Sequence, residues 1–374
     1  MSLFNVYPLF DVTPVRAKDI YVYDDKGIEY LDLYGGHAVI SIGHSHPTYV
    51  AAITEQIQTL GFYSNAIQNP LQAKLANKFE VLSGCEGYHL FMCSSGAEAN
   101  ENALKLASFH NQKHRILAFK NSFHGRTSAA VAATDNTKIV APLNAQQGVD
   151  FVELGNLNAV ENILKQNETC SVIVECIQGV GGLDQSTTEF CQGLEKLCKH
   201  YNIVLIADEV QSGFGRTGDF FAFEKHNFKP DIISIAKGMG NGFPVGGILI
   251  HPKIQASYGL LGTTFGGNHL ACAATLSVLE VLENENLMQN AKEMSDYFVD
   301  KAEKIPKLKA VKGRGLMLGL EFDFPVATLR KNLLYHQHIF TGSSKNPNLI
   351  RILPPLTIQK KHIDLLFEAL KLEL

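Results

Sequence analysis

Apolar runs without polar alternation are the feature that most constrains the fold of this chain. Ser171–Cys176 reads S-V-I-V-E-C, and Ile203–Ala207 is apolar throughout before the acids Asp208 and Glu209. A strand that is apolar on both faces must be covered on both sides, and helical patterns such as Glu189–Tyr201 alternate with these runs. The sequence therefore predicts an α/β fold with a mostly parallel central sheet. Ligands of such sheets bind at the carboxyl ends of the strands.

The remaining elements divide the chain into three parts. We expect an N-terminal segment over residues 1–45, a large domain over 46–274, and a small α+β C-terminal domain over 275–374, beside which the N-terminal segment packs. The expected strands, besides the two runs above, are Ile20–Tyr23, Ile28–Leu33, Tyr88–Cys93, Arg115–Phe119, Asp150–Glu153, Asp231–Ile235, Gly247–Ile250, Leu318–Phe322 and Leu349–Leu353. The other expected helices are Pro47–Gln58, Pro70–Leu82, Ala97–His110, His269–Asn284, Leu287–Ile305, Ala327–Tyr335 and one from about Gln359.

Composition excludes several classes of function. The formal net charge of −4 gives no overall field that would attract nucleic acid or an acidic membrane surface. No apolar window is long enough for a transmembrane helix, and Met1–Phe10 lacks the basic start of a signal peptide. Seven cysteines without a C-x-x-C pair are typical of reduced, buried thiols. We therefore expect a cytoplasmic protein with no metal site.

Two turns that follow strands offer ligand contacts. The sequence C-S-S-G-A-E-A-N places Ser95, Gly96 and Ala97 where a helix begins, and the free N–H groups at a helix start bind phosphate well. An ordinary N-capped helix would look the same. In N-S-F-H-G-R-T, Phe123 suits stacking on a flat ring and Arg126 suits a carboxylate, although a core aromatic and a solvated arginine are the common alternatives.

An acid and a lysine at two strand ends form the strongest combination. Asp208 ends the Ile203–Ala207 run, and an acid there needs a partner such as a protonated pyridine nitrogen, a basic side chain or a helix start. Lys237 follows the Asp231–Ile235 run among small residues. Partial burial lowers the pKa of a lysine and favours amine chemistry with aldehydes. A surface lysine in a glycine-rich turn is the plain alternative.

Two further segments add candidate contacts. Thr263 and Thr264 lie in a glycine-rich loop before a helix, which suits either a second phosphate contact or a simple capped turn. Arg351 lies in an apolar strand with no adjacent acid. Such an arginine binds either a substrate carboxylate or a structural acid.

Taken together, these segments resemble the class III (subgroup II) pyridoxal-phosphate aminotransferases of fold type I, and within them the acetylornithine and succinylornithine aminotransferases. The most specific stretch is L-I-A-D-E-V-Q-S-G-F-G-R-T-G followed by D-I-I-S-I-A-K-G-M-G-N-G-F-P-V-G-G. The segments S-S-G-A-E-A-N-E, S-F-H-G-R-T and T-T-F-G-G-N appear in the family's order. The resemblance covers the chain from about Tyr7 to its end.

The resemblance implies a role for each candidate. Lys237 would hold pyridoxal 5'-phosphate and move the proton, and Asp208 would pair with the pyridine nitrogen. The other cofactor contacts implied are Ser95, Gly96, Ala97, Phe123, Val210 and Gln211 from one subunit, with Thr264 from the neighbouring subunit of a homodimer. The substrate contacts implied are Arg126, Arg351, Thr263, Tyr7 and Glu175.

The implied reaction moves the δ-amino group of N-acetylornithine or N-succinylornithine to 2-oxoglutarate in arginine biosynthesis. The segment E-C-I-Q-G-V-G-G departs from the family's frequent E-P-I-Q-G-E-G-G, so Val180 replaces a glutamate that masks the carboxylate-binding arginine in ornithine-using relatives. That change favours an N-acylated donor. Thr263 and His37 also depart from the pattern and leave the acyl group open, with His37 a candidate contact for a succinyl carboxylate.

The sequence leaves three alternatives to this reaction. Within the same fold, the donor could be free ornithine, 4-aminobutyrate or another ω-amino acid. A nucleotide-binding oxidoreductase would need G-x-G-x-x-G after an early strand, which the chain lacks at Tyr88–Ala97. A non-catalytic relative would have no need of both Lys237 and Asp208.

Overall fold

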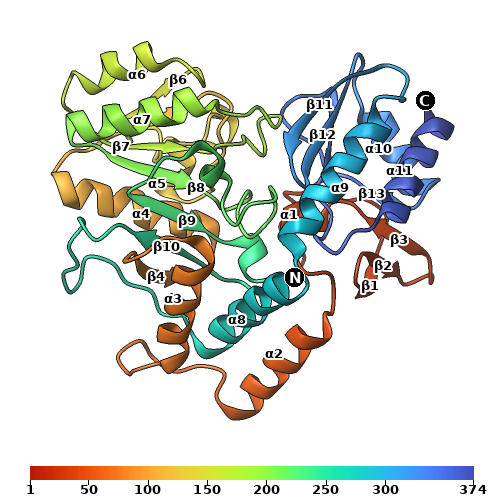
Figure 1. Ribbon diagram of the computed structural model, residues 1–374, viewed down its shortest axis with the longest axis horizontal. Coiled ribbons are helices and arrows are strands. Elements are labelled where there is room, and N and C mark those ends of the chain that lie inside the picture. The colour runs from red at the N-terminus through yellow and green to blue at the C-terminus, as the bar shows by residue number, and fades with distance from the viewer.

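A seven-stranded sheet forms the centre of the larger lobe in the computed structural model, which describes all residues from 1 to 374 (Figure 1). The strand order is β4-β10-β9-β8-β7-β5-β6, and β10 runs antiparallel to both of its neighbours. The other strands share one direction, which confirms the predicted mostly parallel sheet. The strands are β4 (His89–Cys93), β5 (Arg115–Phe119), β6 (Val149–Val152), β7 (Thr169–Val174), β8 (Val204–Asp208), β9 (Ile232–Ile235) and β10 (Gly246–Ile250).

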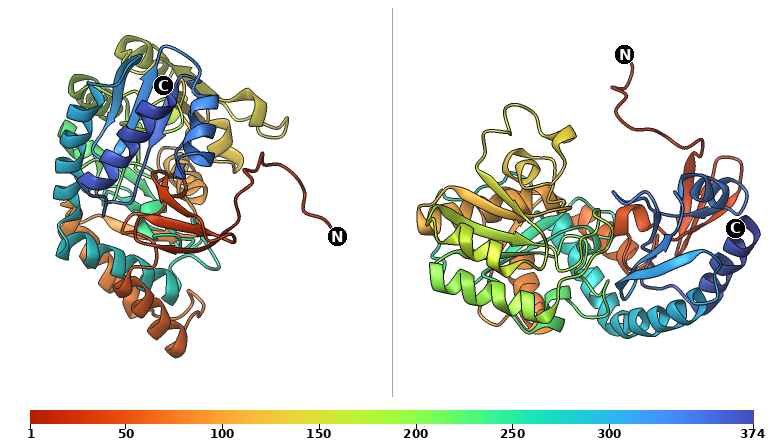
Figure 2. Two further views of the ribbon diagram at one scale, coloured as in Figure 1. Left: turned by 90° about the vertical axis from the view of Figure 1, so that its right-hand side faces the viewer. Right: turned by 90° about the horizontal axis from the view of Figure 1, so that it is seen from above.

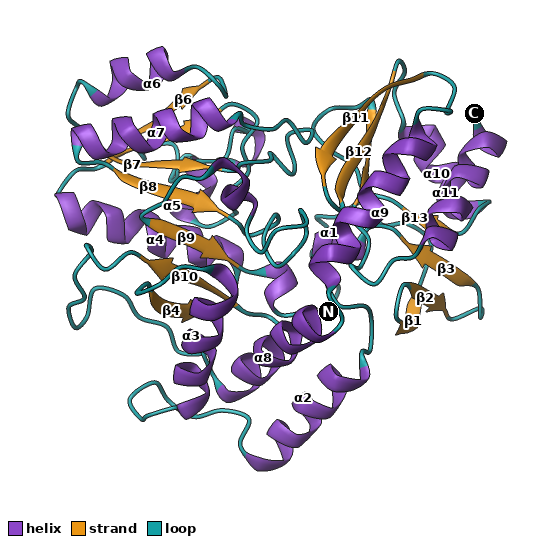
Figure 3. Ribbon diagram, in the orientation of Figure 1, coloured by secondary structure: helices purple, strands orange, loops and turns teal.

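Helices cover both faces of this sheet, because successive side chains of each buried strand point to opposite faces. Ile206 of β8 packs into the cluster that contains α4 (Gly96–Asn111), whereas Leu205 packs into the cluster that contains α7 (Thr188–Tyr201). Figures 1 and 3 show these helices flanking the strands. The remaining helices of this lobe are α2 (Pro47–Thr59), α3 (Pro70–Ser83), α5 (Ser128–Ala132), α6 (Leu157–Leu164) and α8 (His269–Asn284).

The smaller lobe combines two short sheets with the helices α1, α9, α10 and α11 (Figure 1). One sheet is antiparallel, in the order β11-β12-β14, and the other joins the chain's beginning to its later part in the order β1-β2-β3-β13. In the latter, Ile339 pairs with Leu31 in parallel. The bounds are β1 (Pro14–Lys18), β2 (Tyr21–Asp24), β3 (Glu29–Asp32), α1 (Gly35–Ala38), α9 (Leu287–Ala302), β11 (Leu308–Arg314), β12 (Met317–Phe322), α10 (Ala327–Tyr335), β13 (Ile339–Phe340), β14 (Leu349–Ile352) and α11 (Lys360–Glu373). The domain bounds at residues 45 and 274 stay a prediction.

The chain's beginning lies apart from both lobes. Figure 2 shows the segment before β1 running away from the body of the molecule. Its apolar side chains are exposed, and Tyr7 is 74% exposed. None of the helices is both long enough and apolar enough to cross a membrane. All seven cysteines are buried free thiols, as the sequence predicts.

Candidate functional site

A cavity of about 420 Å³ opens at the carboxyl ends of the central strands. It brings together residues from the segment after β7, the end of β8, the turn after β9 and the start of α4, which are far apart in the sequence. Its lining includes the predicted residues Ser95, Gly96, Ala97, Phe123, Arg126, Glu175, Val180, Asp208, Val210, Gln211 and Lys237. The position agrees with the rule that open α/β sheets bind ligands at this edge.

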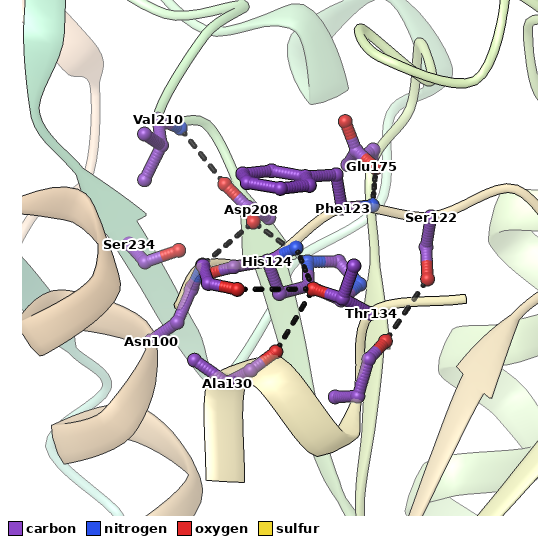
Figure 4. Close-up of polar contacts among 12 residues, drawn as sticks. Asn100, Ser122, Phe123, His124, Ala130, Thr134, Glu175, Asp208, Val210 and Ser234 are labelled. Atoms are coloured by element: carbon purple, nitrogen blue, oxygen red, sulfur yellow. Dashed lines mark hydrogen bonds and ion pairs between the residues drawn. The ribbon is translucent and has the colours of Figure 1, made fainter. Parts of the chain in front are cut away.

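The carboxylate of Asp208 lies at the floor of the cavity and is held by three hydrogen bonds (Figure 4). Its Oδ2 atom accepts from Nδ2 of Asn100 at 2.7 Å and lies 2.7 Å from Nδ1 of His124. Its Oδ1 atom accepts from the backbone N–H of Val210 at 3.0 Å. Asp208 is only 5% exposed. A buried carboxylate fixed in this way presents its remaining lone pairs to a cationic group in the cavity.

Lys237 reaches the same cavity from the turn after β9. Burial of its ammonium lowers the pKa of Lys237 to about 8, although the charges of Asp208 and Glu175 act in the opposite direction. Its φ of +49° lies in the left-handed region, which is uncommon outside glycine. Strained backbone at a cavity is a frequent sign of a functional residue. A lysine with this pKa has a larger share of neutral amine at neutral pH than an ordinary lysine has.

The first turn of α4 forms one wall of the cavity. The hydroxyl of Ser95 accepts from the N–H of Glu98 at 3.2 Å, so Ser95 is the helix N-cap. The N–H groups of Gly96 and Ala97 lie in the first turn, where no intrahelical acceptor exists. A Cβ atom at Gly96 would lie 2.5 Å from Cγ1 of Val210, so a larger residue would close the space against Val210. This turn is therefore an ordinary N-capped helix start, and it also has the free N–H groups and the space that an anion requires.

Phe123 and Glu175 are joined at the cavity wall. Oε1 of Glu175 accepts from the N–H of Phe123 at 2.9 Å, and Oε2 accepts from the N–H of Gly179 at 2.9 Å (Figure 4). Burial raises the pKa of Glu175 above its usual range. Glu175 therefore fixes two loops that line the site.

The two predicted carboxylate-binding arginines differ in their surroundings. Arg126 is exposed and lines the cavity. Arg351 is 3% exposed, and its hydrogen bonds all go to neutral oxygens: the carbonyl of Ser343, the carbonyl of Gly179 at 3.0 Å and Oε1 of Gln211 at 3.3 Å. Arg351 thus lies behind Gln211 with no carboxylate partner.

Within one chain, four of the predicted contacts are absent from the cavity lining, and the buried Arg351 is one of them. Tyr7 is on the exposed N-terminal segment. Thr263 lines a separate hollow beside Asn65, where its hydroxyl accepts from the N–H of Gly266 at 3.1 Å. Thr264 is exposed. The roles of Tyr7, Thr263 and Thr264 in substrate or cofactor binding stay predictions, and these contacts would require a second subunit.

His37 contacts Tyr34 rather than a charged partner. Partial burial and the positive charges of Arg351 and Lys237 lower the pKa of His37 to about 4. At neutral pH this ring is uncharged, so it offers a substrate a hydrogen bond and no charge.

Sequence reasoning missed Asn100 and His124, the two side chains that hold Asp208. Both lie inside motifs that it had singled out, S-S-G-A-E-A-N and S-F-H-G-R-T. Asn100 is one turn after Gly96, so the signal was the helical spacing of four residues. Arg216 fastens the loop after β8, because its guanidinium donates to the carbonyls of Leu316 and Ile40 at 3.3 Å each and also to the carbonyl of Pro354.

Comparisons with known proteins agree along the whole chain. The family model described as Aminotransferase class-III matches residues 5–374. The acetylornithine aminotransferase of Aquifex aeolicus is 40% identical over 384 residues, covering 99% of this chain and 98% of the relative. The corresponding enzyme of Bacillus subtilis is 38% identical, covering 97% and 94%. The solved ornithine aminotransferase of Toxoplasma gondii, which has PLP at partial occupancy in its active site, has a TM-score of 0.90 at 26% identity and covers 98% of this chain and 90% of its own.

Proposed function

The chain belongs to the class III aminotransferases, which are pyridoxal-phosphate enzymes, and on that premise we propose that it transfers the δ-amino group of an N-acylornithine to 2-oxoglutarate. N-acetylornithine is the proposed donor, and N-succinylornithine is the related possibility. The products would be the N-acylglutamate semialdehyde and glutamate, a step of arginine biosynthesis. The relatives named as acetylornithine aminotransferases support this choice over the free ornithine suggested by the solved neighbours.

The cavity fits the cofactor on observations independent of the family. A phosphate requires donors and space at a helix start, and Gly96 leaves space that a Cβ atom would fill. A protonated ring nitrogen requires a fixed buried carboxylate, and Asp208 is oriented by Asn100 and His124. Phe123 and Val210 line the space between these two ends. When bound, pyridoxal phosphate supplies an aldehyde for amine exchange and a ring that accepts electrons.

The chain's own residues would then divide the work. Lys237, with its pKa near 8, would hold the cofactor through its side-chain amine, and the same amine could move a proton at the reacting carbon. Asp208 would pair with the ring nitrogen and favour its protonated form. Ser95, Gly96 and Ala97 would bind the phosphate, and Gln211, which also lines the cavity, would lie beside the ring. Arg126 and Arg351 would bind substrate carboxylates.

The observation that carries the choice of donor is the absence of an acid beside Arg351. Its guanidinium contacts only neutral oxygens, and Val180 lines the cavity next to Gly179, whose carbonyl accepts from that guanidinium. An arginine without an acid partner favours carboxylates in both half-reactions. An N-acylated donor carries a net negative charge there, whereas free ornithine brings an α-ammonium group.

We also propose a cytoplasmic homodimer as the active form. Thr264 is exposed and lies outside its own cavity, which suits a contact to the cofactor phosphate of the neighbouring subunit. Thr263 and Tyr7 would contact substrate in the same assembly. Seven buried free thiols are consistent with a reducing compartment.

A donor panel tests this function. Initial rates are measured with N-acetylornithine, N-succinylornithine, ornithine and 4-aminobutyrate at a fixed concentration of 2-oxoglutarate. The proposal expects kcat/KM for an N-acyl form to exceed that for ornithine by at least about tenfold, which corresponds to about 1.4 kcal/mol of transition-state stabilisation. A clear preference for free ornithine would reject it in favour of the ornithine alternative.

A further inference from the structure

Three metal-ligating side chains converge beneath the central sheet, outside the cofactor cavity. Cys176 follows β7, Cys191 lies on α7, and His226 ends the short 3₁₀ turn η2 (Ala222–His226). One donor atom from each lies within 4.8 Å of the other two, and all three residues are buried. None of them lines the cavity or takes part in the proposed reaction.

We propose that Cys176, Cys191 and His226 form a structural zinc site. Two thiolates and an imidazole supply three of the four ligands of a tetrahedral Zn²⁺ site, with Zn–S distances of about 2.3 Å and Zn–N distances of about 2.0 Å, and leave the fourth position to a further ligand. Donor atoms within 4.8 Å of one another need only a small contraction to reach that geometry. The ligands are 15 and 35 residues apart along the chain, from 176 to 191 and from 191 to 226, so no short sequence motif reveals them.

Neighbouring hydroxyl groups complete the surroundings. The backbone N–H of Ser186 donates to the carbonyl of Cys176 at 2.9 Å, and the Ser186 hydroxyl is buried without a hydrogen-bond partner. A water molecule held by this hydroxyl would complete the tetrahedral set. The hydroxyl of Thr188 lies 3.2 Å from Nδ1 of His226 and orients the ring. Contacts of this kind outside the ligand set fix the metal-binding histidines of known sites.

The charge balance also favours a cation held by two thiolates. Two thiolates neutralise Zn²⁺, so the filled site carries no net charge into the core. Arg314 donates to the carbonyl of Ala222 at 2.9 Å, at the beginning of the same turn that carries His226. Its Nε and Nη1 atoms are buried without partners.

Zinc at this position would fasten three elements of the larger lobe: the end of β7, helix α7 and turn η2. Cys176 directly follows Glu175, whose carboxylate fixes Phe123 and Gly179 at the cavity. The site is therefore structural, and its effect on the cavity passes through the end of β7.

The test is a metal analysis of the purified holoenzyme. The wild-type protein, Cys191→Ala and the matched control Cys198→Ala are loaded with Zn²⁺ and desalted, and zinc per chain is measured by mass spectrometry. Cys198 is also buried on α7 but is absent from the cluster. We expect about one zinc per chain in wild type and in Cys198→Ala. X-ray absorption spectra at the zinc edge should show sulfur ligands at about 2.3 Å. In Cys191→Ala the zinc content per chain should fall at least several-fold.

A second measurement covers the case that Cys191→Ala folds poorly. The thermal midpoint of the wild-type holoenzyme is followed with added Zn²⁺ and after chelation, and the site predicts a rise with zinc and a fall with chelator. Substoichiometric zinc in the loaded wild type, equal zinc in Cys191→Ala and wild type, or a Cys176–Cys191 disulfide in the native protein would each overturn the assignment. The zinc content does not depend on which donor the enzyme uses, so failure here leaves the proposed reaction untouched.

Discussion

Nδ1 of His124 lies 2.7 Å from Oδ2 of Asp208, and both side chains are almost completely buried beneath the cofactor cavity. The same carboxylate oxygen accepts from Nδ2 of Asn100 at 2.7 Å. Hydrogen bonds to charged groups contribute about 1.5–3 kcal/mol each, so these two contacts determine where the carboxylate points. The residue that would keep the cofactor protonated is therefore itself positioned by a histidine and an asparagine.

Removing either contact is expected to slow the reaction without abolishing it. His124→Ala and Asn100→Ala should lower kcat about 10- to 100-fold, the change that about 1.5–3 kcal/mol produces. The absorption spectrum of bound cofactor should also change its pH dependence, since the ring nitrogen would be less firmly paired. Ser122→Ala is the control, because Ser122 lies in the same loop and donates to the carbonyl of Ala133 instead. Equal spectra for His124→Ala and wild type would argue against this positioning role.

Introducing an acid at Val180 should change the choice of donor. A carboxylate there would lie next to Gly179 and compete for the guanidinium of Arg351. We expect Val180→Glu to lower kcat/KM for the N-acylated donor about tenfold or more, corresponding to about 1.4 kcal/mol, and to raise that for free ornithine. Val180→Gln has a similar size without the charge and should leave the ratio of the two donors closer to wild type. Identical donor ratios for the Glu and Gln variants would count against a masking charge.

Arg351 and Arg126 should differ in the effect of replacement. Arg351→Lys keeps the charge but loses the fork that contacts Gly179 and Gln211, so we expect KM for 2-oxoglutarate to rise about tenfold with a smaller change in kcat. Arg126 is exposed in the free enzyme, so Arg126→Lys should have a smaller effect on KM for 2-oxoglutarate. The comparison is made by steady-state kinetics at saturating donor. An unchanged KM in Arg351→Lys would remove this residue from substrate binding.

The low pKa of Lys237 predicts how the cofactor-free protein reacquires pyridoxal phosphate. Only the neutral amine attacks an aldehyde, and a lowered pKa means that the proton leaves at lower pH. The rate of reconstitution should therefore rise through a midpoint near pH 8, the pKa of Lys237 set by its burial, and then level off. Stopped-flow absorbance across a pH series measures this rate. A rate that continues to climb to about pH 10, as for an ordinary lysine, would contradict the burial argument.

The sequence predicts the buried elements well and the exposed ones poorly. The bounds of β5, α8 and α10 agree with the expected ranges, because their apolar patterns are long or sharply ended. β1 and β11 were missed, and their side chains are mostly exposed or half-buried, so they carry little apolar signal. Helix α6 was missed because it has only eight residues. The antiparallel direction of β10 depends on tertiary pairing with β4 and β9, which local pattern does not encode.

The same division holds for the site. Asp208 and Lys237 are detectable because each is a charged residue at the end of an apolar strand. His124 was not assigned a role, since its significance depends on contact with a residue 84 positions away. No sequence pattern indicates the cluster of Cys176, Cys191 and His226, because only the fold brings these three residues together. The contact proposed for Thr264 depends on a neighbouring subunit, so the pattern of one chain does not predict its geometry.

Attachment of the cofactor to Lys237 is the central claim, and one measurement tests it directly. The purified protein is treated with borohydride in the presence of pyridoxal phosphate, digested, and analysed by peptide mass spectrometry, with Lys237→Arg treated in parallel. The account predicts a yellow protein that loses its colour on reduction and carries a phosphopyridoxyl group on Lys237, with none at this position in the variant. A colourless protein, or a label on another lysine with Lys237 unmodified, would contradict the account.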